Sequence, residues 1–230
     1  MSMKLILFDC DGTLVDSQHN IARAMREAYA ALGVSYPGDE ATRRVIGLSL
    51  VEAIARLSPD LDRAMHERLA AAYKEAFLAL RTGPDFHEPM FPGAMETLRA
   101  LAERDDVLLG IATGKARRGL DVLLDRFGIR DLFVTLQTAD DAPSKPHPGM
   151  ILRAMDETGM EPHQTLIVGD TTHDMLMARH AGIAGLGVAW GYHPPQELRA
   201  AGAHDIAGHF GEVPPKAEAL VPRRQEAAEG

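Results

Sequence analysis

Short runs of apolar residues, each followed by a polar turn, recur along the chain. The first covers residues 4–8 (KLILF) and ends abruptly in the sequence DCDG at residues 9–12. A short run that is apolar throughout is typical of a strand buried on both faces, as in a parallel sheet. Similar runs lie at residues 107–112, around 133–136, at 165–168 and at 186–190. Most of them precede a helical pattern, which predicts an α/β fold with a doubly wound, mostly parallel sheet.

Residues 17–88 follow a different pattern, with helical periodicity and no convincing strand. Ile21, Met25 and Tyr29 recur at the spacing of one helix face, and Gly33 marks the end of that helix. Further apolar stripes follow at the same spacing. We therefore expect this part of the chain to be all-helical.

The change of pattern divides the chain. We expect the helical segment at 17–88 to be inserted into an α/β core made of residues 1–16 and 89–210. Residues 211–230 are rich in Pro, Ala, Glu and Arg and contain few large apolar side chains. Such a composition buries little apolar surface, so we expect a loosely ordered tail there.

Charge and cysteine content narrow the classes of partner and location. The net charge is −9 and the pI is about 5.5. Surfaces that bind nucleic acid or anionic membranes need concentrated Lys and Arg, so we expect neither partner. The single cysteine, Cys10, rules out an internal disulfide. With no N-terminal signal pattern and no apolar run long enough to span a bilayer, the sequence predicts a cytoplasmic protein.

Carboxylates follow two of the predicted strands. Asp9 and Asp11 come directly after the first run and are two residues apart, so both side chains can face one pocket. Asp170 follows the run at 165–168, and Asp174 lies about one helical turn further on. Ligands of open α/β sheets bind at the carboxyl ends of the strands. Because close carboxylates repel one another and Mg²⁺ prefers carboxylate oxygens, these residues are candidate Mg²⁺ ligands.

Groups suited to phosphate follow the other runs. Thr113 and Gly114 end the run at 107–112, where a hydroxyl and turn N–H groups can hold phosphate oxygens. Lys145, in the sequence SKP, supplies a point charge suited to a phosphate or to a nucleophile. Each feature alone is more often an ordinary turn or helix cap than a functional site. Their placement at successive strand ends favours a shared active site for phosphoryl transfer.

The same residues resemble the four motifs of the haloacid dehalogenase superfamily. The segment DCDGTLVDS at 9–17 is similar to the first motif, Thr113 to the second, Lys145 to the third, and GDTTHD at 169–174 to the fourth. The resemblance covers nearly the whole chain except the tail. It implies an α/β core, a helical cap at 17–88 that selects the substrate, and Mg²⁺-dependent phosphatase chemistry.

The resemblance also implies a role for each matching residue. Asp9 attacks phosphorus and forms an aspartyl-phosphate, and Asp11 protonates the leaving oxygen and then activates water. Thr113 binds the phosphoryl oxygens, and Lys145 neutralises charge and orients Asp9. The implied Mg²⁺ ligands are Asp9, the backbone carbonyl of Asp11, and Asp170, with Asp174 in support.

Within the superfamily, the sequence favours a phosphatase that resembles phosphoglycolate phosphatases. Asp11 argues against the dehalogenases, which lack this second aspartate. The fourth motif lacks the adjacent Glu-Asp of sugar-phosphate mutases, and residues 45–50 are apolar where mutases carry basic groups. Phosphonatases need a cap lysine, and Lys74 fits a solvated helix face better. A pyrophosphatase, a mutase and a non-catalytic phosphometabolite-binding protein remain as alternatives.

A small phosphorylated acid would need a cationic partner. The candidates are Arg43, Arg44, Lys115, Arg117 and Arg118. Each alone is more often a surface charge, but Lys115 directly follows the Thr-Gly turn, so we assign Gly114 and Lys115 to substrate binding. His173, between two acidic candidates, fits a solvated helix start. The sequence leaves open the exact substrate, the roles of Arg43 and Arg44, and the choice between monomer and homodimer.

Overall fold

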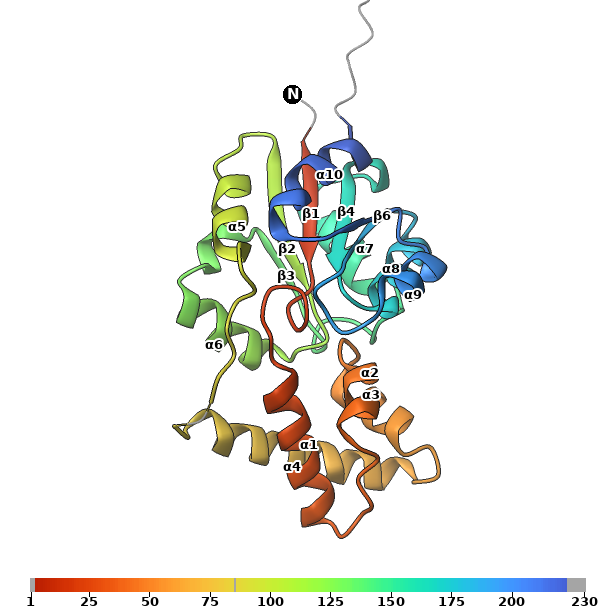
Figure 1. The fold of residues 1–230 in the computed structure, drawn as a ribbon. Helices are drawn as coiled ribbons and strands as arrows, with labels where there is room; N and C mark the ends of the chain where they lie inside the picture. Colours follow the sequence, from red (N-terminus) through yellow and green to blue (C-terminus); the bar gives the residue numbers. More distant parts are fainter. Residues whose placement is uncertain (1–2, 85, 223–230) are drawn as a thin grey trace, which may run out of the picture.

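Six strands form one parallel sheet in the computed structural model, which describes residues 3–84 and 86–222. The strands are β1 (Lys4–Phe8), β2 (Val107–Ala112), β3 (Thr135–Gln137), β4 (Thr165–Gly169), β5 (Ala184–Val188) and β6 (Asp205–Ala207). Their order is β3-β2-β1-β4-β5-β6, and every neighbouring pair is parallel. The predicted doubly wound parallel sheet is confirmed (Figure 1).

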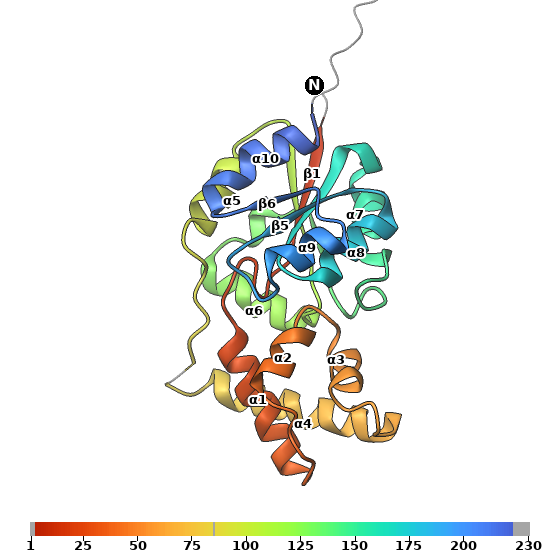
Figure 2. The same ribbon diagram turned by 45° about the vertical axis from the view of Figure 1, so that its right-hand side comes forward.

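Strand β1 lies in the middle of the sheet because its side chains are apolar on both faces. Ile6 and Phe8 point into one apolar cluster, and Leu5 and Leu7 point into the other. The first cluster is covered by α5 (Ala94–Ala102), α6 (Arg117–Phe127) and α10 (Val213–Leu220), and the second by α7 (Gly149–Thr158) and α8 (Thr172–Ala181). Figure 2 shows these helices on the two sides of the strands.

The remaining helices complete the core. Helix α9 (Pro195–Ala201) packs on α8 through Leu198 and Met175. The short 3₁₀ helices are η1 (Arg130–Leu132), η2 (Pro162–Gln164) and η3 (Phe210–Glu212). Among the described residues, no helix combines the length and the apolar composition that a bilayer crossing requires.

Four helices between β1 and β2 form a separate all-helical layer, here called the helical insert. They are α1 (Gln18–Ala31), α2 (Asp39–Val45), α3 (Leu50–Leu57) and α4 (Arg63–Arg81). The insert has its own apolar cluster, which includes Met25, Tyr29, Ile54 and Leu69. Figures 1 and 2 show it beyond the carboxyl ends of the strands, next to the loops that follow them.

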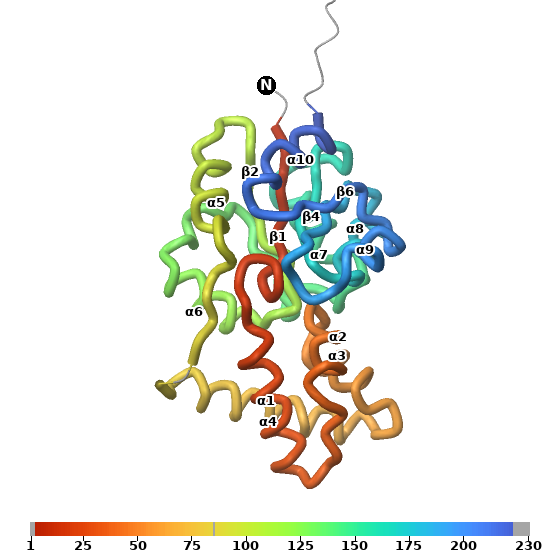
Figure 3. The backbone as a smooth tube through the Cα atoms, in the orientation of Figure 1, coloured from red at the N-terminus to blue at the C-terminus, as the bar shows by residue number. Residues whose placement is uncertain are grey.

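Two linkers join the helical insert to the core, and they run side by side (Figure 3). Val15 of the first linker forms an antiparallel bridge with Met90 of the second. The N–H of Asp16 donates to the carbonyl of Pro89 at 2.9 Å, and the N–H of Phe91 donates to the carbonyl of Leu14 at 2.9 Å. The insert is therefore anchored through a short paired ribbon.

The predicted loose tail is wrong for the described part of 211–230. Residues 213–220 form α10; Val213 and Ala217 in this helix, and Val221 directly after it, are buried against the sheet. These three residues recur at a spacing of four, so one helix face is apolar despite the polar composition. Pro214 lies in the first turn, where a helix tolerates proline. Residues 223–230 lie outside the described residues.

Candidate active site

The carboxyl ends of β1 and β4 carry the acidic residues of the site. The strand order reverses at β1, because β2 lies on one side of it and β4 on the other. Such a reversal leaves a crevice beyond the strand ends, and ligands of α/β sheets bind there. One oxygen each from Asp9, Asp170 and Asp174 lies within 4.8 Å of the other two, and all three residues are buried.

Local hydrogen bonds hold two of these carboxylates. Thr13 Oγ1 donates to Oδ1 of Asp170 at 2.8 Å, and the N–H of Tyr192 donates to Oδ2 at 2.8 Å. Asp174 is the third residue of α8 and forms a capping box with Thr171, whose N–H and hydroxyl both donate to Oδ2 of Asp174. The start of α8 therefore fixes the position of Asp174.

Two glycines allow the backbone to approach Asp170. A Cβ built on Gly12 would lie 2.6 Å from Cγ of Asp170, and one built on Gly191 would also lie 2.6 Å from it. Gly12 also has a φ of 87°, which side-chain-bearing residues rarely adopt. The glycine of the DCDG sequence is thus required by both backbone conformation and space.

Lys145 is the cation inside the carboxylate cluster. Its Nζ lies 2.6 Å from Oδ1 of Asp174 and 3.0 Å from Oδ1 of Asp9, and the side chain is fully buried. Burial lowers the pKa of Lys145, but its two carboxylate partners outweigh burial and raise it above the ordinary value. Three buried carboxylates thus share one ammonium, which leaves excess negative charge in a dry site.

The pKa values of two of these carboxylates are raised. Burial, with a smaller contribution from Asp174, raises the pKa of Asp9 to about 7 despite the opposing effect of Lys145. Burial also raises the pKa of Asp170. Oδ2 of Asp9 is buried and has no hydrogen-bond partner among the described residues. An all-oxygen cluster with excess negative charge fits a Mg²⁺ ion.

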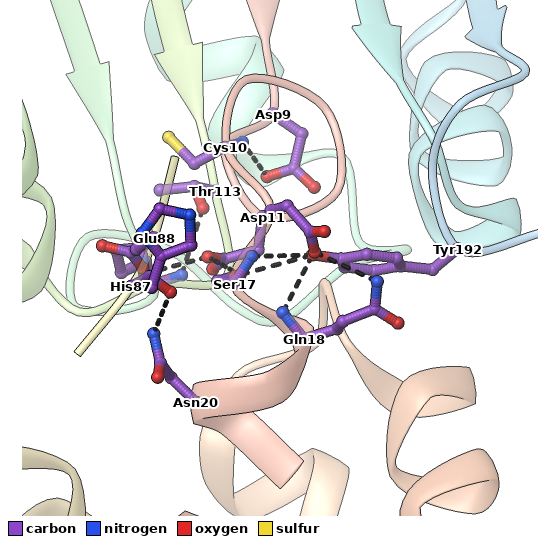
Figure 4. Close-up of polar contacts among 12 residues, drawn as sticks. Asp9, Cys10, Asp11, Ser17, Gln18, Asn20, His87, Glu88, Thr113 and Tyr192 are labelled. Atoms are coloured by element: carbon purple, nitrogen blue, oxygen red, sulfur yellow. Dashed lines mark hydrogen bonds and ion pairs between the residues drawn. The ribbon is translucent and has the colours of Figure 1, made fainter. Parts of the chain in front are cut away.

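Asp11 does not join this cluster through its side chain. Its Oδ1 accepts a hydrogen bond from Ser17 Oγ at 2.6 Å and lies 2.9 Å from Nζ of Lys115. Figure 4 shows the Asp11 carboxylate beside Ser17, Gln18 and Tyr192, apart from Asp9. The Asp9 and Asp11 carboxylates were expected to face one pocket, but the Asp11 carboxylate lies apart. Asp9 is grouped instead with Asp170 and Asp174, here called the acidic trio. A metal contact through the Asp11 backbone carbonyl stays a prediction.

Lys115 links Asp11 to the second linker. Its Nζ lies 3.5 Å from Oε1 of Glu88, which is buried. Burial lowers the pKa of Lys115, but Asp11 and Glu88 more than offset this and raise it. Lys115 thus already has two carboxylate partners, which weakens its assignment as the cation for a substrate carboxylate. No motif in the sequence identifies Glu88, because its role depends on contact with a distant loop.

Thr113 and Gly114 lie at the end of β2, next to β1. Thr113 is buried, its N–H donates to the carbonyl of Gln137 at 3.0 Å, and its Oγ1 accepts from the N–H of Lys115 at 3.2 Å. Figure 4 shows Thr113 close to Cys10 and Asp11. A Cβ built on Gly114 would lie 2.6 Å from the carbonyl oxygen of Leu48, so the helical insert touches the core there.

Further contacts hold the insert against the core. The carbonyl of Arg44 lies 3.4 Å from Nε2 of His173 and 3.3 Å from Nε2 of His193, and the Arg44 guanidinium pairs with Glu197. The N–H of Ser49 donates to Ser144 Oγ at 2.9 Å. The insert is closed over the site in this structure.

The expectation of a solvated His173 is wrong. The side chain is buried between the core and the insert, and burial lowers its pKa to about 4. The imidazole is therefore neutral near pH 7 and can contact a carbonyl through one N–H. Two of the other cationic candidates also have protein partners: Arg117 pairs with Asp141 at 2.7 Å, and Arg44 with Glu197. Cys10 is buried in the apolar cluster.

A family model described as haloacid dehalogenase-like hydrolase matches residues 6–188. The chain therefore belongs to the haloacid dehalogenase-like hydrolases. It is 38% identical over 222 residues to the probable phosphatase IndB of Dickeya dadantii, with 94% of each chain covered. It is 32% identical over 199 residues to a phosphoglycolate phosphatase of Pseudomonas putida, covering 83% of this chain and 71% of that one. A hydrolase structure from Pseudomonas syringae superposes with a TM-score of 0.83 at 26% identity, covering 96% and 99% of the two chains.

Proposed function

We propose that this hydrolase is a Mg²⁺-dependent phosphatase that cleaves phosphomonoesters of small metabolites through an aspartyl-phosphate on Asp9. One observation carries the proposal. Oδ2 of Asp9 is buried beside Asp170, Asp174 and Lys145 and has no hydrogen bond within the part of the chain that the structure describes. Such an oxygen is held in place and free to attack, and its surroundings suit a phosphoryl group with its cation.

The residues divide into those that hold charge and those that move protons. A bound Mg²⁺ would be held by Asp9, Asp170 and the backbone carbonyl of Asp11, with Asp174 in support, and would offset negative charge on the transferring group. Lys145 adds a second positive charge next to Asp9. The Thr113 hydroxyl and the N–H of Gly114 bind phosphoryl oxygens.

In the first step, Oδ2 of Asp9 attacks phosphorus and the bond from phosphorus to the ester oxygen breaks. Asp11 donates a proton to that oxygen, so the alcohol leaves uncharged. Lys115 and Ser17 hold the Asp11 carboxyl in position, since both contact its Oδ1. The product of this step is a phosphorylated Asp9 and a neutral alcohol.

In the second step, Asp11 accepts a proton from water as the water attacks phosphorus. The bond between phosphorus and Asp9 breaks, inorganic phosphate forms, and the Asp9 carboxylate is regenerated. Dividing hydrolysis into two displacements lets fixed groups align each attack. We assign residues 17–88 as a cap that excludes water, and 1–16 with 89–210 as the catalytic core.

The similarity to a phosphoglycolate phosphatase supports a small phosphorylated metabolite as the substrate. A pyrophosphatase would release phosphate from pyrophosphate, and a mutase would interconvert sugar phosphates with little free phosphate. A non-catalytic binding protein would release none. We further propose a cytoplasmic location, which suits a single buried cysteine.

Phosphate release tests the proposal. The protein is incubated with Mg²⁺ and a panel of phosphomonoesters that includes 2-phosphoglycolate, with pyrophosphate and a sugar phosphate alongside. We expect phosphate release from at least one ester, its loss in EDTA, and its restoration by added Mg²⁺. Release that persists in EDTA contradicts the Mg²⁺ dependence, and release from no member of the panel contradicts the phosphatase activity.

A further inference from the structure

A cavity between the helical insert and the core begins at Asp11. It has a volume of about 680 Å³ and is lined by Asp11, Gly114 and Lys115 on the core side. The acidic trio and Lys145 do not line it. Because Asp11 is the residue assigned to protonate the ester oxygen, the cavity extends from the leaving-group side of the site and not from the phosphoryl side.

The walls of this cavity are mainly apolar. The insert contributes apolar side chains from α1, α3, α4 and the segment between α2 and α3: Ile21, Met25, Leu48, Val51, Tyr73 and Phe77. The rings of Tyr73 and Phe77 are stacked, with their centroids 5.7 Å apart. Apolar and aromatic walls favour apolar ligand surface, because burying such surface removes it from water.

The charges near Asp11 disfavour an anionic group next to the ester oxygen. Lys115 is the cation nearest to Asp11 in the cavity, and it already contacts the carboxylates of Asp11 and Glu88. When Asp11 carries the proton that it donates, Glu88 already balances the Lys115 ammonium, so a carboxylate one carbon from the ester oxygen, as in glycolate, would find no unpaired cation there. Lys74, Arg81 and Arg118 also line the cavity, but Lys74 and Arg118 are exposed to solvent, and no ion pair joins any of the three to Asp11 among the described residues.

The volume of the cavity also favours a leaving group larger than glycolate. Cavities of about 300–1,000 Å³ bind ligands of ring-containing, drug-like size. Glycolate or a second phosphate would fill a small part of this space and would leave the apolar walls in contact with water. A leaving group that fills the cavity gains binding free energy that a small acid cannot.

We propose, on the basis of the phosphatase activity proposed above, that this cavity binds the leaving group of the substrate and selects a ring-sized, mainly apolar alcohol. The carbons next to its ester oxygen carry no charge. The preferred substrates are therefore phosphomonoesters of ring-bearing alcohols, and Leu48 and Phe77 are residues that determine this specificity.

Three primary alkyl esters test the proposal: ethyl phosphate, 2-phenylethyl phosphate and 2-phosphoglycolate. The first two have simple alcohols of similar acidity, so their comparison isolates the contact with the ring. With Mg²⁺ present, we expect kcat/KM for 2-phenylethyl phosphate to exceed that for each of the other two on the order of 10- to 100-fold, as burial of one ring allows.

Two outcomes separate this inference from the proposed function. If ethyl phosphate or 2-phosphoglycolate is hydrolysed as efficiently as the phenylethyl ester, the apolar leaving-group assignment is overturned while the phosphatase activity stands. If no ester releases phosphate, both are overturned.

Variants locate the specificity. Phe77→Ala and Leu48→Ala are each expected to lower the ratio of kcat/KM for 2-phenylethyl over ethyl phosphate on the order of tenfold. Leu152→Ala is the matched control, because Leu152 is a leucine exposed on α7 and outside the cavity. A melting temperature for each variant verifies folding. An unchanged ratio in both folded cavity variants overturns the assignment of these walls.

Discussion

Asp9 and Asp11 are separated by one residue, yet their surroundings prepare them for different tasks. Asp9 is fully buried against Lys145, and one of its oxygens has no hydrogen bond to residues 3–84 or 86–222. Asp11 contacts the hydroxyl of Ser17 and the ammonium of Lys115. A buried carboxylate with an unpaired oxygen suits a nucleophile, whereas a carboxyl held by a hydroxyl and an ammonium at the mouth of a cavity suits a group that gives up and regains a proton. The division of roles follows from these contacts.

Glu88 is predicted to affect the proton-donating role of Asp11 through Lys115. In Glu88→Gln, Lys115 loses one of its two carboxylate partners and contacts Asp11 alone, so the variant changes the surroundings of the group that donates the proton. We expect kcat/KM for an alkyl phosphate to fall about tenfold. For p-nitrophenyl phosphate, whose leaving group departs without a proton, the decrease should be much smaller. Steady-state kinetics with both esters measures this difference.

The exposed cap residue Glu40 provides the control for that variant. Glu40→Gln should change neither value of kcat/KM. Equal losses for the two esters in Glu88→Gln would mean that Glu88 supports the fold or the phosphoryl site and does not act through Asp11. The parameter kcat/KM is used because it reports only the steps up to departure of the alcohol.

The sequence predicts the identity of the site residues better than their contacts. The position of Asp9, Asp170 and Asp174 follows from strand ends and one helix start, which the hydrophobic pattern reveals. The orientation of Asp11 does not, because β1 ends at Phe8 and the chain then turns into a bridge between Asp11 and Val15. Alternation of side chains holds only along a strand. The Lys115–Glu88 contact joins two distant loops, and no local pattern encodes it.

The segment between α2 and α3 is the element of the insert that touches the catalytic core most closely. Gly47, with a φ of 97°, lets the chain turn back toward the core, and Gly114 lets the carbonyl of Leu48 approach. The closed position of the insert therefore depends on a glycine at position 114, where any side chain would collide with it. It also depends on the contacts that Arg44 and Ser49 make with the core. Close contact of this kind excludes water from the site.

Gly114→Ala is predicted to hold the insert away from the core. The added methyl would overlap the backbone of residues 47–48, and relief of such an overlap costs about 1–3 kcal/mol. We expect kcat/KM to fall about 10- to 100-fold with a smaller change in melting temperature, since the insert has its own apolar cluster. Activity and thermal unfolding are compared with those of Gly208→Ala, where the nearest atom to a new Cβ is 3.7 Å away. Activity equal to that of the control would contradict the closed position.

The sequence predicts those helices and strands that are long or that have a clear apolar pattern. The central strand and the strand at 107–112 appear where the apolar runs lie. Strand β6 and helix α10 were not predicted, because three residues make too short an apolar run and an Ala- and Pro-rich helix lacks large apolar residues. Their structure depends on burial against β5 and α5, which is a tertiary effect.

For the whole molecule, the buried charge of the site is a cost to stability that a cation offsets. Three buried carboxylates and one buried ammonium carry excess negative charge. A ligand that binds the folded state but not the unfolded one stabilises it, by about 2.7 kcal/mol at a concentration 100 times Kd. Mg²⁺ is therefore predicted to raise the melting temperature of the wild type, and Asp170→Asn is predicted to remove most of that increase. Thermal unfolding with EDTA or with Mg²⁺ measures the effect.

The response to Mg²⁺ should also depend on pH. Without a cation the pKa of Asp9 is raised to about 7, so below that pH a proton occupies the carboxylate and Mg²⁺ must displace it. Raising the pH from about 6 to about 8 should therefore increase the stabilisation by Mg²⁺. The buffers at the two pH values contain no Ca²⁺ and have the same ionic strength. Asp60→Asn, which alters an exposed aspartate of the insert, is the control variant and should respond to Mg²⁺ as the wild type does. A stabilisation independent of pH would contradict the protonation of Asp9.

The covalent step is the part of the account on which every other role depends. The protein is mixed with Mg²⁺ and an ester that it hydrolyses, quenched in acid within one turnover, and analysed by intact mass and by peptide mapping. We predict that the wild type gains one phosphoryl group on the peptide that contains Asp9. Asp9→Asn should show neither this gain nor turnover. Sustained phosphate release by folded Asp9→Asn would contradict the mechanism.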